Sequence, residues 1–439
     1  MPRLEGARTT GPPAREAAFK VLQGVRRGRR LDRALQAAHV PSADRPWVQE
    51  LTYGVSRLCG RLDYLLGRHL DRGVRSLPTD VQTLLRMGAY QGLYMGGVPP
   101  YAAVSETVSS VRGLRGKVLA GLTNAVLRRV FEDGASEDLF PDPETDGVGH
   151  LETWGSHPRW LVERWLERAP LATVRSWVAR NNEVPIVCVR PFRETVETAA
   201  GRLRDAGLQT ESTIAAGTCL ELAKGVDVAA ALACVDGFVQ DPAAAMVAEF
   251  ARPEPGTWVA DLCAAPGGKS LALASMRHAV LAADSSAARL TKLRENLERL
   301  DASIRLVRAR AEAPPLAEAP AILLDVPCTG TGTLRRHPDA RWRIDSQRLA
   351  SLVEVQARML DGAAEAVAMG GLLVYATCSL EHEENDEQVH RFLARHAGFR
   401  LDTARSPAHG AEDGTGILRL TPEHTGYDGA FAARLRRVH

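Results

Sequence analysis

The second half of the chain alternates short apolar runs with longer amphipathic segments, and this alternation constrains the fold more than any other feature. The apolar runs are TWVADLCA, AVLAADSS, SIRLVRAR, AILLDVP and LLVYATCS, and segments of helical pattern such as SSAARLTKLRENLERL lie between them. Strands that are apolar throughout and alternate with helices are typical of a parallel sheet covered on both faces. We therefore predict a doubly wound α/β domain over residues 241–439, with GAFAARLRRV as a late antiparallel edge strand.

The residues before this domain follow other patterns. Residues 1–135 carry apolar side chains at helical spacing and are predicted to form an all-α bundle. Residues 136–155 are acidic and rich in Gly and Pro, which predicts a linker. Residues 156–240 begin with a helical run and continue with strand, helix and strand patterns, so we predict a small α/β module there. A chain of 439 residues is long enough for several domains.

Composition excludes several classes of protein. The hydrophobic fraction of 45% and the charged fraction of 25% are those of a globular protein. No apolar run approaches the roughly 20 residues that span a bilayer, and the N-terminus lacks the apolar core of a signal peptide. We therefore expect a cytoplasmic protein, a monomer, with no membrane contact. The seven cysteines form no CxxC pair and no Cys/His cluster of metal-ligand spacing, which predicts neither a disulfide framework nor a metal site.

Charge is distributed unevenly along the chain. Residues 1–130 contain 21 Lys and Arg against 9 Asp and Glu, a net charge of +12, whereas the remainder carries −10. A basic domain joined to an acidic one indicates contact between the first domain and a polyanion. A solvated Arg-rich surface accounts for the same numbers, and charge alone leaves both interpretations open.

Two of the predicted strands end in residues suited to a nucleoside-bearing cofactor, because ligands of such sheets bind at the carboxyl ends of the strands. Asp284 ends the second strand, where an acid can accept hydrogen bonds from a ribose diol. The glycines in the loop after the first strand let the backbone approach a ligand closely. That loop consists of Cys263, Ala264, Ala265, Pro266, Gly267, Gly268 and Lys269. It is neither a GxGxxG motif nor a phosphate-binding P-loop, so S-adenosylmethionine fits better than a dinucleotide. A plain tight turn is the alternative for the loop alone.

Two further strands end in cysteines. Asp325 and Cys328 follow the fourth strand, and Cys378 follows the fifth. Because neighbouring parallel strands lie about 4.8 Å apart, we expect the two thiols to converge on one pocket beside the cofactor. A single cysteine at a strand end is commonplace, whereas two of them flanking an acid are hard to attribute to packing.

Two thiols beside a methyl donor suit the methylation of a pyrimidine at carbon 5. A thiolate that adds to carbon 6 makes carbon 5 nucleophilic, and after methylation a base removes the carbon-5 proton as the thiolate leaves. Asp325 would offset the charge that develops on the ring, and the target base would leave its stack to enter the pocket. These residues do not by themselves decide which thiol is the nucleophile.

The stretch that follows Cys328 is basic. Gly330 and Gly332 give the loop conformational freedom. The residues predicted to hold the phosphates around the target base are Arg335, Arg336, His337, Arg341 and Arg343. A solvated basic loop is the alternative.

Several motifs resemble those of the RNA cytosine-5 methyltransferases. They are CAAPGGK (263–269), DVPCTGTGTLRRHPD (325–339), YATCS (375–379), EEND (383–386), GFVQDPAA (237–244) and DGAFAARL (428–435). The helical N-terminus resembles a NusB-type RNA-binding domain in segments such as ELTYGVSRLCGRLD and RMGAYQGLYMGGVPPYAAVSE. A NusB-like bundle with such an enzyme is the architecture of the RsmB (Sun/Fmu) type, which methylates small-subunit ribosomal RNA in bacteria. The resemblance therefore implies a Rossmann-like methyltransferase domain, a small RNA-binding α/β module, and ribosomal RNA as the substrate.

The same resemblance implies roles for individual residues. Cys378 is the nucleophile, and Cys328 assists release of the methylated product. The residues implied to bind S-adenosylmethionine are those of the 263–269 loop together with Asp284, Arg289 and Asp325.

Two positions depart from the family pattern. Val326 stands where the family usually has Ala, and Arg310 stands where it tends to carry an acid, with Glu312 two residues on. The residue that meets the adenine is therefore left open. Two alternatives for the function remain as well: the same chemistry on transfer RNA, and a non-catalytic RNA-binding or assembly factor. The second would be expected to have lost a thiol or the cofactor loop, and both are present.

Overall fold

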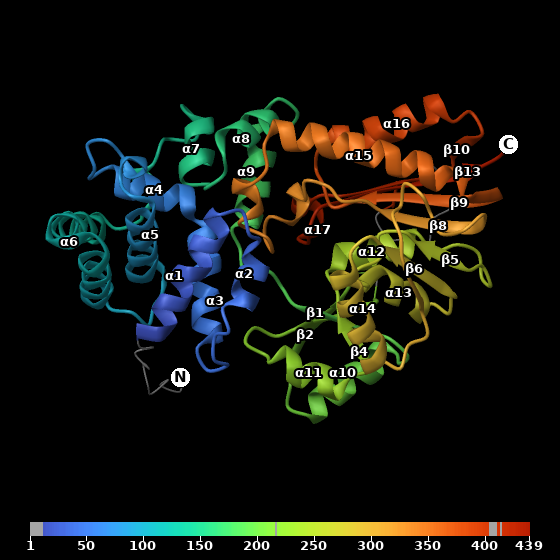
Figure 1. Ribbon diagram of the computed structural model, residues 1–439, viewed down its shortest axis with the longest axis horizontal. Helices are drawn as coiled ribbons and strands as arrows, with labels where there is room; N and C mark the ends of the chain where they lie inside the picture. Colours follow the sequence, from blue (N-terminus) through green and yellow to red (C-terminus); the bar gives the residue numbers. More distant parts are fainter. Residues whose placement is uncertain (1–11, 216, 404–410, 413–414) are drawn as a thin grey trace. The chain divides into compact units, whose positions relative to one another are not determined.

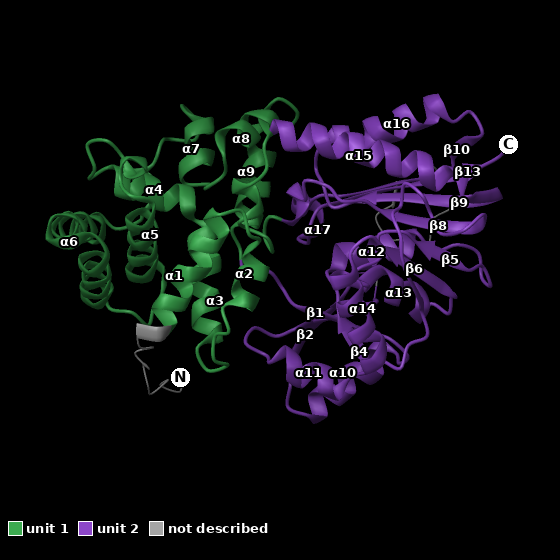
Figure 2. Ribbon diagram, in the orientation of Figure 1, with its two compact units in different colours: residues 1–183, 334–345 green, residues 184–333, 346–439 purple. Residues whose placement is uncertain are grey.

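The computed structural model describes residues 12–215, 217–403, 411–412 and 415–439, and the chain divides into two compact units (Figures 1 and 2). Unit 1 runs to Glu183 and also includes Leu334–Asp345. Unit 2 comprises Val184–Thr333 and Ser346–His439. A short segment from the second half of the sequence is therefore part of the first unit.

Unit 1 is built of helices, as predicted for the N-terminal domain. Its α-helices are α1 (Pro12–Arg26), α2 (Leu31–Ala37), α3 (Arg45–Arg57), α4 (Cys59–Gly67), α5 (Thr79–Tyr94), α6 (Pro100–Asp133), α7 (Gly147–Thr153), α8 (Arg159–Leu166) and α9 (Leu171–Asn181). Single 3-10 turns lie at η1 (Val74–Ser76), η2 (Glu137–Leu139) and η4 (Ala340–Trp342). The core is rich in leucine, and Leu51, Leu62 and Leu85 are fully buried in it. Helix α6 is interrupted at Gly116, whose φ of 80° is not helical.

The stretch 136–155, predicted to be a linker, is folded in the structure. Phe140 is buried, with its ring stacked on Tyr64 at 4.8 Å and edge-on to Trp154 at 5.2 Å. The difference arises because these few aromatic contacts outweigh the acidic, Gly- and Pro-rich composition. The helical run α8–α9 also groups with unit 1, so the α/β part of the predicted small module begins at Val184.

Unit 2 begins with a small antiparallel sheet. Its strands are β1 (Cys188–Pro191), β2 (Thr210–Ile214), β3 (Cys219–Leu222) and β4 (Gly237–Val239), in the order β2-β3-β1-β4. Helices α10 (Val196–Asp205) and α11 (Val228–Cys234) connect them. The apolar side chains of both helices pack with Val189, Leu220 and Leu222 of the sheet.

The rest of unit 2 is a doubly wound domain around a large mixed sheet. The strand order is β11-β12-β13-β9-β8-β5-β6-β7, and β10 pairs with β13. The strands are β5 (Val259–Asp261), β6 (Val280–Asp284), β7 (Arg305–Arg308), β8 (Ala319–Asp325), β9 (Val367–Thr377), β10 (Phe399–Leu401), β11 (Ala411–Glu412), β12 (Ile417–Leu420) and β13 (Ala430–Arg437). The neighbours from β9 through β7 are parallel, as predicted. β13 is antiparallel to β9, but β12 pairs with its other side, so it is not the predicted edge strand.

Helices cover both faces of this sheet (Figure 1). One face packs on α12 (Pro242–Phe250), α13 (Gly268–Ser275) and α14 (Ala287–Arg299), and the other on α15 (Ser346–Glu365) and α16 (Asp386–Arg395). The short helix α17 (Pro422–Thr425) and the 3-10 turns η3 (Thr331–Thr333) and η5 (His382–Glu384) lie in connections. Successive residues of β8 alternate between the two cores, with Leu323 in one and Leu324 in the other. Burial on both faces explains the uninterrupted apolar strands of the sequence.

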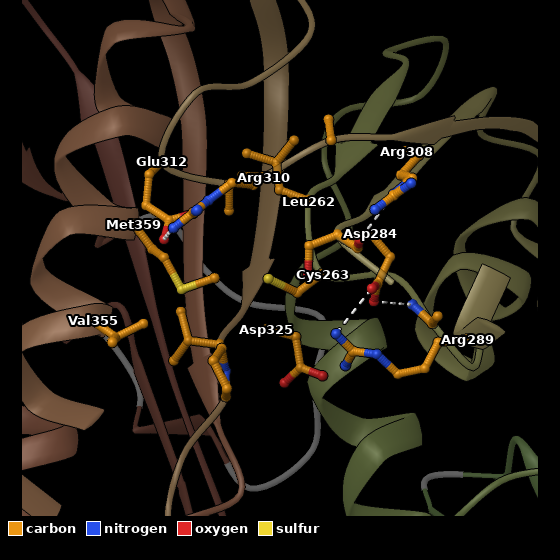
Figure 3. A pocket seen from close by; sticks show the side chains of 16 residues that line it. Leu262, Cys263, Asp284, Arg289, Arg308, Arg310, Glu312, Asp325, Val355 and Met359 are labelled. Atoms are coloured by element: carbon orange, nitrogen blue, oxygen red, sulfur yellow. Dashed lines mark hydrogen bonds and ion pairs between the residues drawn. The ribbon is translucent and has the colours of Figure 1, made fainter. Parts of the chain in front are cut away.

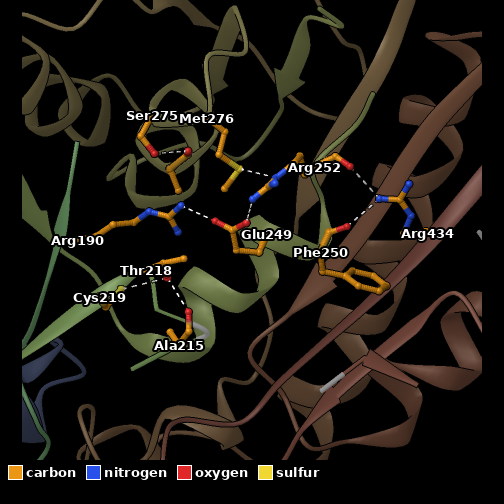
Figure 4. Close-up of polar contacts among 11 residues, drawn as sticks. Arg190, Ala215, Thr218, Cys219, Glu249, Phe250, Arg252, Ser275, Met276 and Arg434 are labelled. Atoms are coloured by element: carbon orange, nitrogen blue, oxygen red, sulfur yellow. Dashed lines mark hydrogen bonds and ion pairs between the residues drawn. The ribbon is translucent and has the colours of Figure 1, made fainter. Parts of the chain in front are cut away.

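A buried ion pair joins the small sheet of unit 2 to α12. Arg190 Nη2 of β1 lies 2.6 Å from Glu249 Oε1, and both side chains are buried. Figure 4 shows Glu249 between Arg190 and Arg252, while Arg434 of β13 donates to the carbonyl of Phe250 at 2.8 Å. Because the Glu249 carboxylate of α12 binds the Arg190 guanidinium of β1, the small sheet and the large domain are held together inside one unit.

Candidate active site

The ends of four neighbouring strands supply the polar residues of the site. β9, β8, β5 and β6 are adjacent and parallel, so their carboxyl ends lie along one edge of the sheet. Asp261 ends β5, Asp284 ends β6 and Asp325 ends β8, while Cys378 directly follows β9. Of these residues, Asp284, Asp325 and Cys378 were predicted from the sequence to lie at this edge.

A pocket of about 870 Å³ opens at this edge. Its lining includes Cys263, Ala265, Asp284, Arg289, Arg310, Glu312, Asp325 and Met359 (Figure 3). Arg310, which stands where an acid was expected, forms an ion pair with Glu312 at 3.1 Å. Both residues line the pocket, so the pocket has an acid here although Arg310 occupies the position where the family usually has one.

Asp284 is almost completely buried at one side of the pocket. Its carboxylate accepts hydrogen bonds from the N–H groups of Ser286 at 2.8 Å and Ala265 at 3.3 Å, and it pairs with Arg289 Nη2 at 2.9 Å. Figure 3 shows the Arg289 side chain directed toward this carboxylate. Arg289 and the 263–269 loop are thereby fixed to the acid that was predicted to meet a ribose.

The loop between β5 and α13 requires glycine at Gly267. This residue has a φ of 110°, and a Cβ atom there would lie 2.2 Å from Leu293 Cδ1. Ser270 Oγ of the following helix donates to Asp261 Oδ2 at 2.6 Å. Burial raises the pKa of Asp261 to about 7, and it raises the pKa of the Cys263 thiol well above its usual value. Cys263 is therefore a neutral wall residue rather than a thiolate.

Lys269 and Asp325 form an ion pair next to the thiols. Lys269 Nζ lies 2.7 Å from Asp325 Oδ2. Burial lowers the pKa of Lys269, but the charge and hydrogen bond of Asp325, together with the charge of Cys378, more than offset this, so the pKa lies above its ordinary value. Lys269 is the last residue of the 263–269 loop, so this loop interacts with Asp325 through a hydrogen bond and with Cys378 through charge.

The sulfur atoms of Cys328 and Cys378 lie 3.2 Å apart. This distance exceeds the roughly 2.05 Å of a disulfide, and both cysteines are free. The hydrogen bond to Cys378 raises the pKa of Cys328 well above its usual value, and burial adds to the effect. Cys328 therefore keeps its proton near pH 7, and its sulfur lies within hydrogen-bond distance of the Cys378 sulfur.

The thiol loop is packed rather than free. Thr331, Gly332 and Thr333 are buried in η3, and Gly332 N donates to the carbonyl of Cys378 at 3.0 Å. A Cβ atom at Gly332 would lie 2.5 Å from the carbonyl oxygen of Gly429. This glycine therefore permits close approach of two chain segments, where the sequence predicted conformational freedom.

The residues predicted to contact RNA phosphates lie in the segment that joins unit 1. Arg335 is 9% exposed and pairs with Glu183 at 3.2 Å. Arg336 and His337 are half-buried, and burial lowers the pKa of His337 to about 4, so this imidazole is neutral near pH 7.

Arg341 does not fit the RNA-binding role predicted for it. Its side chain is completely buried, and its guanidinium donates to the carbonyls of Ser156 at 3.0 Å and Asn181 at 3.0 Å and to Asn182 Oδ1 at 2.8 Å. The sequence places Arg341 after a loop rich in Gly and Thr, which predicts an exposed side chain. In the structure Arg341 instead donates hydrogen bonds to buried carbonyl groups inside unit 1.

Sequence reasoning also missed two buried polar residues of the site. Glu384 and Gln356 are both fully buried and hydrogen-bond to the residues beside Cys328. Glu384 lies within the EEND motif, which was a recognisable signal, but nothing in the sequence distinguished it from its acidic neighbours. Gln356 lies on a long amphipathic helix and carries no sequence signal.

Comparison with known proteins identifies the family. Residues 248–436 match the family model "16S rRNA methyltransferase RsmB/F", residues 12–132 match the NusB family, and residues 157–229 match the ferredoxin-like domain of RsmF/B-like methyltransferases. The ribosomal RNA small subunit methyltransferase B of Pseudomonas syringae pv. tomato is 35% identical, with 97% of each chain covered. The chain belongs to this RsmB family of ribosomal RNA methyltransferases. The probable enzyme of that name from Synechocystis is 33% identical over 97% of this chain and 99% of its own.

Solved structures show the same fold. The crystal structure of PH0851 superposes with a TM-score of 0.79 at 22% identity and covers 98% of this chain and 100% of its own. NSun6 from Pyrococcus horikoshii with SFG has a TM-score of 0.55 at 20% identity over 64% of this chain and 98% of its own. The predicted RsmB-type architecture is confirmed, and this RsmB-family chain is an S-adenosylmethionine-dependent RNA methyltransferase.

The pocket fits S-adenosylmethionine. Its volume is within the range of small-molecule sites, and Asp284 contributes a buried carboxylate to its lining. In the described ranges, no helix is long and apolar enough to cross a membrane, and no group of three His, Cys, Asp or Glu is placed to hold a metal ion.

Proposed function

We propose that this RsmB-family protein methylates carbon 5 of a cytosine in small-subunit ribosomal RNA through a covalent bond between Cys378 and carbon 6. The observation that carries the proposal is the pair of free thiols 3.2 Å apart, adjoining the Lys269–Asp325 ion pair and the cofactor pocket. The names of the relatives support ribosomal RNA as the substrate. A cytoplasmic location and a monomeric state stay predictions.

The cofactor is held by residues that the structure groups around the pocket. Asp284 meets the ribose hydroxyls, Arg289 orients Asp284, and the 263–269 loop lies against the nucleoside. When bound, S-adenosylmethionine supplies the methyl group that carbon 5 takes up. We assign the adenine contact to Glu312 rather than Arg310, because both line the pocket and the amino group of adenine needs an acceptor.

Cys378 acts as the nucleophile. Its thiolate forms the bond to carbon 6, and the electron density that moves to carbon 5 makes that carbon able to take the methyl group. Asp325 and Lys269 share a proton near the ring and offset the charge that develops on it. A base then removes the carbon-5 proton, the C5–C6 double bond forms, and the sulfur leaves as a thiolate. Cys328, whose sulfur lies 3.2 Å from that of Cys378, assists the departure by donating its thiol hydrogen to the leaving sulfur.

Two alanine variants test this assignment. With ribosomal RNA and S-adenosylmethionine, Cys328→Ala should accumulate an RNA–protein adduct stable to denaturing gel electrophoresis, because release is impaired. Cys378→Ala should give neither adduct nor methylation. Cys234→Ala, a half-buried cysteine of α11, is the matched control and should turn over normally. An adduct in Cys378→Ala would reverse the roles of the two thiols.

Mapping of 5-methylcytosine identifies the substrate. Ribosomal and transfer RNA from cells with and without the gene should differ at a cytosine of the small-subunit RNA. Loss of 5-methylcytosine from transfer RNA alone would make transfer RNA the substrate. No change in either RNA would favour a non-catalytic RNA-binding or assembly factor.

A further inference from the structure

A buried polar cluster surrounds the chain on both sides of Cys328. It consists of Glu384 in η5, Gln356 in α15 and Thr329, which follows Cys328 in the chain. The side chains of Glu384 and Gln356 are 0% exposed. Burying a carboxylate is costly unless hydrogen bonds compensate, so its partners show what the cluster does.

The Glu384 carboxylate holds the residue after Cys328. Thr329 N–H donates to Oε1 at 2.9 Å and to Oε2 at 3.2 Å, and the Thr329 hydroxyl donates to Oε2 at 2.5 Å. The Thr329 hydroxyl also meets Ser379 Oγ at 3.1 Å, next to the second thiol. One carboxylate thereby fixes both the backbone and the side chain of Thr329.

Gln356 connects the Glu384 carboxylate to Pro327, the residue before Cys328, by hydrogen bonds. Its amide nitrogen donates to Glu384 Oε1 at 2.9 Å and to the carbonyl of Pro327 at 3.0 Å. On the other strand end, the Tyr375 hydroxyl donates to the carbonyl of Glu384 at 2.6 Å. The two chain neighbours of Cys328 are thus anchored to one buried group, which is itself anchored to β9, the strand that Cys378 directly follows.

The charge of this group acts on the thiol as well. Burial raises the pKa of Glu384, and the hydrogen bonds from Ser379, Thr329 and Gln356 act in the opposite direction. Among the causes that raise the pKa of Cys328, after its hydrogen bond to Cys378 and its burial, is the charge of Glu384. An apolar side chain would fill the same space without desolvating a carboxylate, so packing alone does not account for the choice.

We propose that Glu384 is the positioning residue for Cys328 in product release, a role that rests on the proposed function. When the bond between Cys378 and carbon 6 breaks, the departing sulfur needs a hydrogen-bond donor. Glu384 holds Cys328 with its sulfur 3.2 Å from the Cys378 sulfur, within reach for its thiol to donate. Glu384 touches neither RNA nor cofactor in this role, so adduct formation does not depend on it, whereas adduct breakdown does.

The test is the lifetime of the covalent adduct in Glu384→Gln. This substitution keeps the shape of the side chain but turns one acceptor into a donor that faces the donors of Thr329 and Gln356. Using radiolabelled small-subunit ribosomal RNA and S-adenosylmethionine, we expect adduct to form within about twofold of the wild-type rate. We expect it to decay about 10- to 100-fold more slowly, because loss of the charge-assisted contact to Thr329 displaces Cys328, whose thiol is needed only for release. The KM for S-adenosylmethionine should stay unchanged.

Two further variants make the result decisive. Glu387→Gln is the matched control, because Glu387 lies on the next helix, is 43% exposed, and pairs with Arg391; its adduct should decay as in the wild type. Thr329→Val removes the hydroxyl donor alone and should lengthen the adduct lifetime by about three- to tenfold, because the Glu384 carboxylate loses one hydrogen bond and keeps those from Thr329 N–H and Gln356. If Glu384→Gln fails to fold, the adduct lifetime in Thr329→Val tests the proposal instead.

Wild-type decay in Glu384→Gln would overturn the proposal. So would an equal loss of formation and decay, because that pattern marks a general structural defect. Failure of Cys328→Ala to accumulate adduct would instead count against the proposed function, so the two failures are distinguishable.

Discussion

Asp261 and Asp284 are both buried carboxylates at strand ends, but their surroundings differ. Asp284 has a guanidinium partner and two N–H donors. Asp261 accepts from the Ser270 hydroxyl, and Oδ1 has no side-chain or backbone hydrogen bond within the described residues. Burial therefore dominates at Asp261 and raises its pKa to about 7.

The raised pKa of Asp261 predicts a pH-dependent stability. The folded pKa lies above the unfolded value, so the protonated acid stabilises the fold below about pH 4, and this contribution is lost as the pH rises through 7. The difference in unfolding free energy between wild type and Asp261→Asn should therefore shift by up to about 4 kcal/mol across this range in favour of the variant. Urea unfolding of both proteins at several pH values measures it, and parallel curves would contradict the pKa assignment.

Individual site residues could be predicted where their type and position were both informative. Asp284, Asp325, Cys328 and Cys378 stand at strand ends, and the edge of a parallel sheet brings them together. The prediction that Arg341 contacts RNA assumed an exposed side chain. A charged side chain can be buried when the fold supplies acceptors for its hydrogen bonds, and the sequence does not show those acceptors. Glu384 and Gln356 were missed because burial of a polar residue depends on tertiary contacts that no local pattern contains.

At the scale of elements, the connection from β8 to α15 is the unusual one. It leaves unit 2 after Thr333, contributes Leu334–Asp345 to unit 1, and returns at Ser346. Arg341 holds this segment, with its Nη2 also donating to the carbonyl of Leu334 at 3.2 Å. The segment next to the thiol loop is thus anchored in the helical unit by a buried arginine.

Arg341→Lys tests the anchor. A lysine cannot reach the same set of carbonyls, because it lacks the planar fork of the guanidinium. We expect unit 1 to lose about 3 kcal/mol of stability, as when a buried charged network is broken. Thermal unfolding measures the loss, and Arg159→Lys, at exposed ion pairs with Glu152 and Glu163 of the same unit, should change little. Weaker RNA binding with unchanged stability would restore the RNA role predicted from the sequence.

The elements of the large sheet followed from the sequence more closely than those around it. Uninterrupted apolar runs identify β5, β6, β8 and β9, because a strand buried on both faces has no other composition. The strand β2, TESTI, is polar and largely exposed, so its pairing with β3 had no hydrophobic signal. The strand β12, which pairs with β13, was missed because it is only four residues long and gives too short a pattern.

At the scale of the whole molecule, the charge asymmetry predicts where RNA is held. Deletion of residues 1–130 would be an unclean test, because the carbonyl of Arg57 and other groups of unit 1 accept hydrogen bonds from Arg341. Surface substitutions separate binding from folding. Arg27 and Arg29 follow α1 and are exposed.

Arg27→Ala combined with Arg29→Ala should weaken RNA binding and reduce its salt dependence. If both contact phosphates, the slope of log K against log salt should fall in magnitude by about 1 to 2. Stability should be unchanged, and Arg391→Ala on α16 of unit 2 serves as the control. A salt slope identical to that of the wild type would place the RNA contact elsewhere.

The central claim is that the Cys378 sulfur carries the base while it is methylated. The most direct measurement is mass spectrometry of the protease- and nuclease-digested adduct from Cys328→Ala. The account predicts a peptide containing Cys378 joined to a cytidine nucleotide that carries one additional methyl group. Attachment at any other residue, or an unmethylated base with the methyl group elsewhere in the RNA, would contradict it.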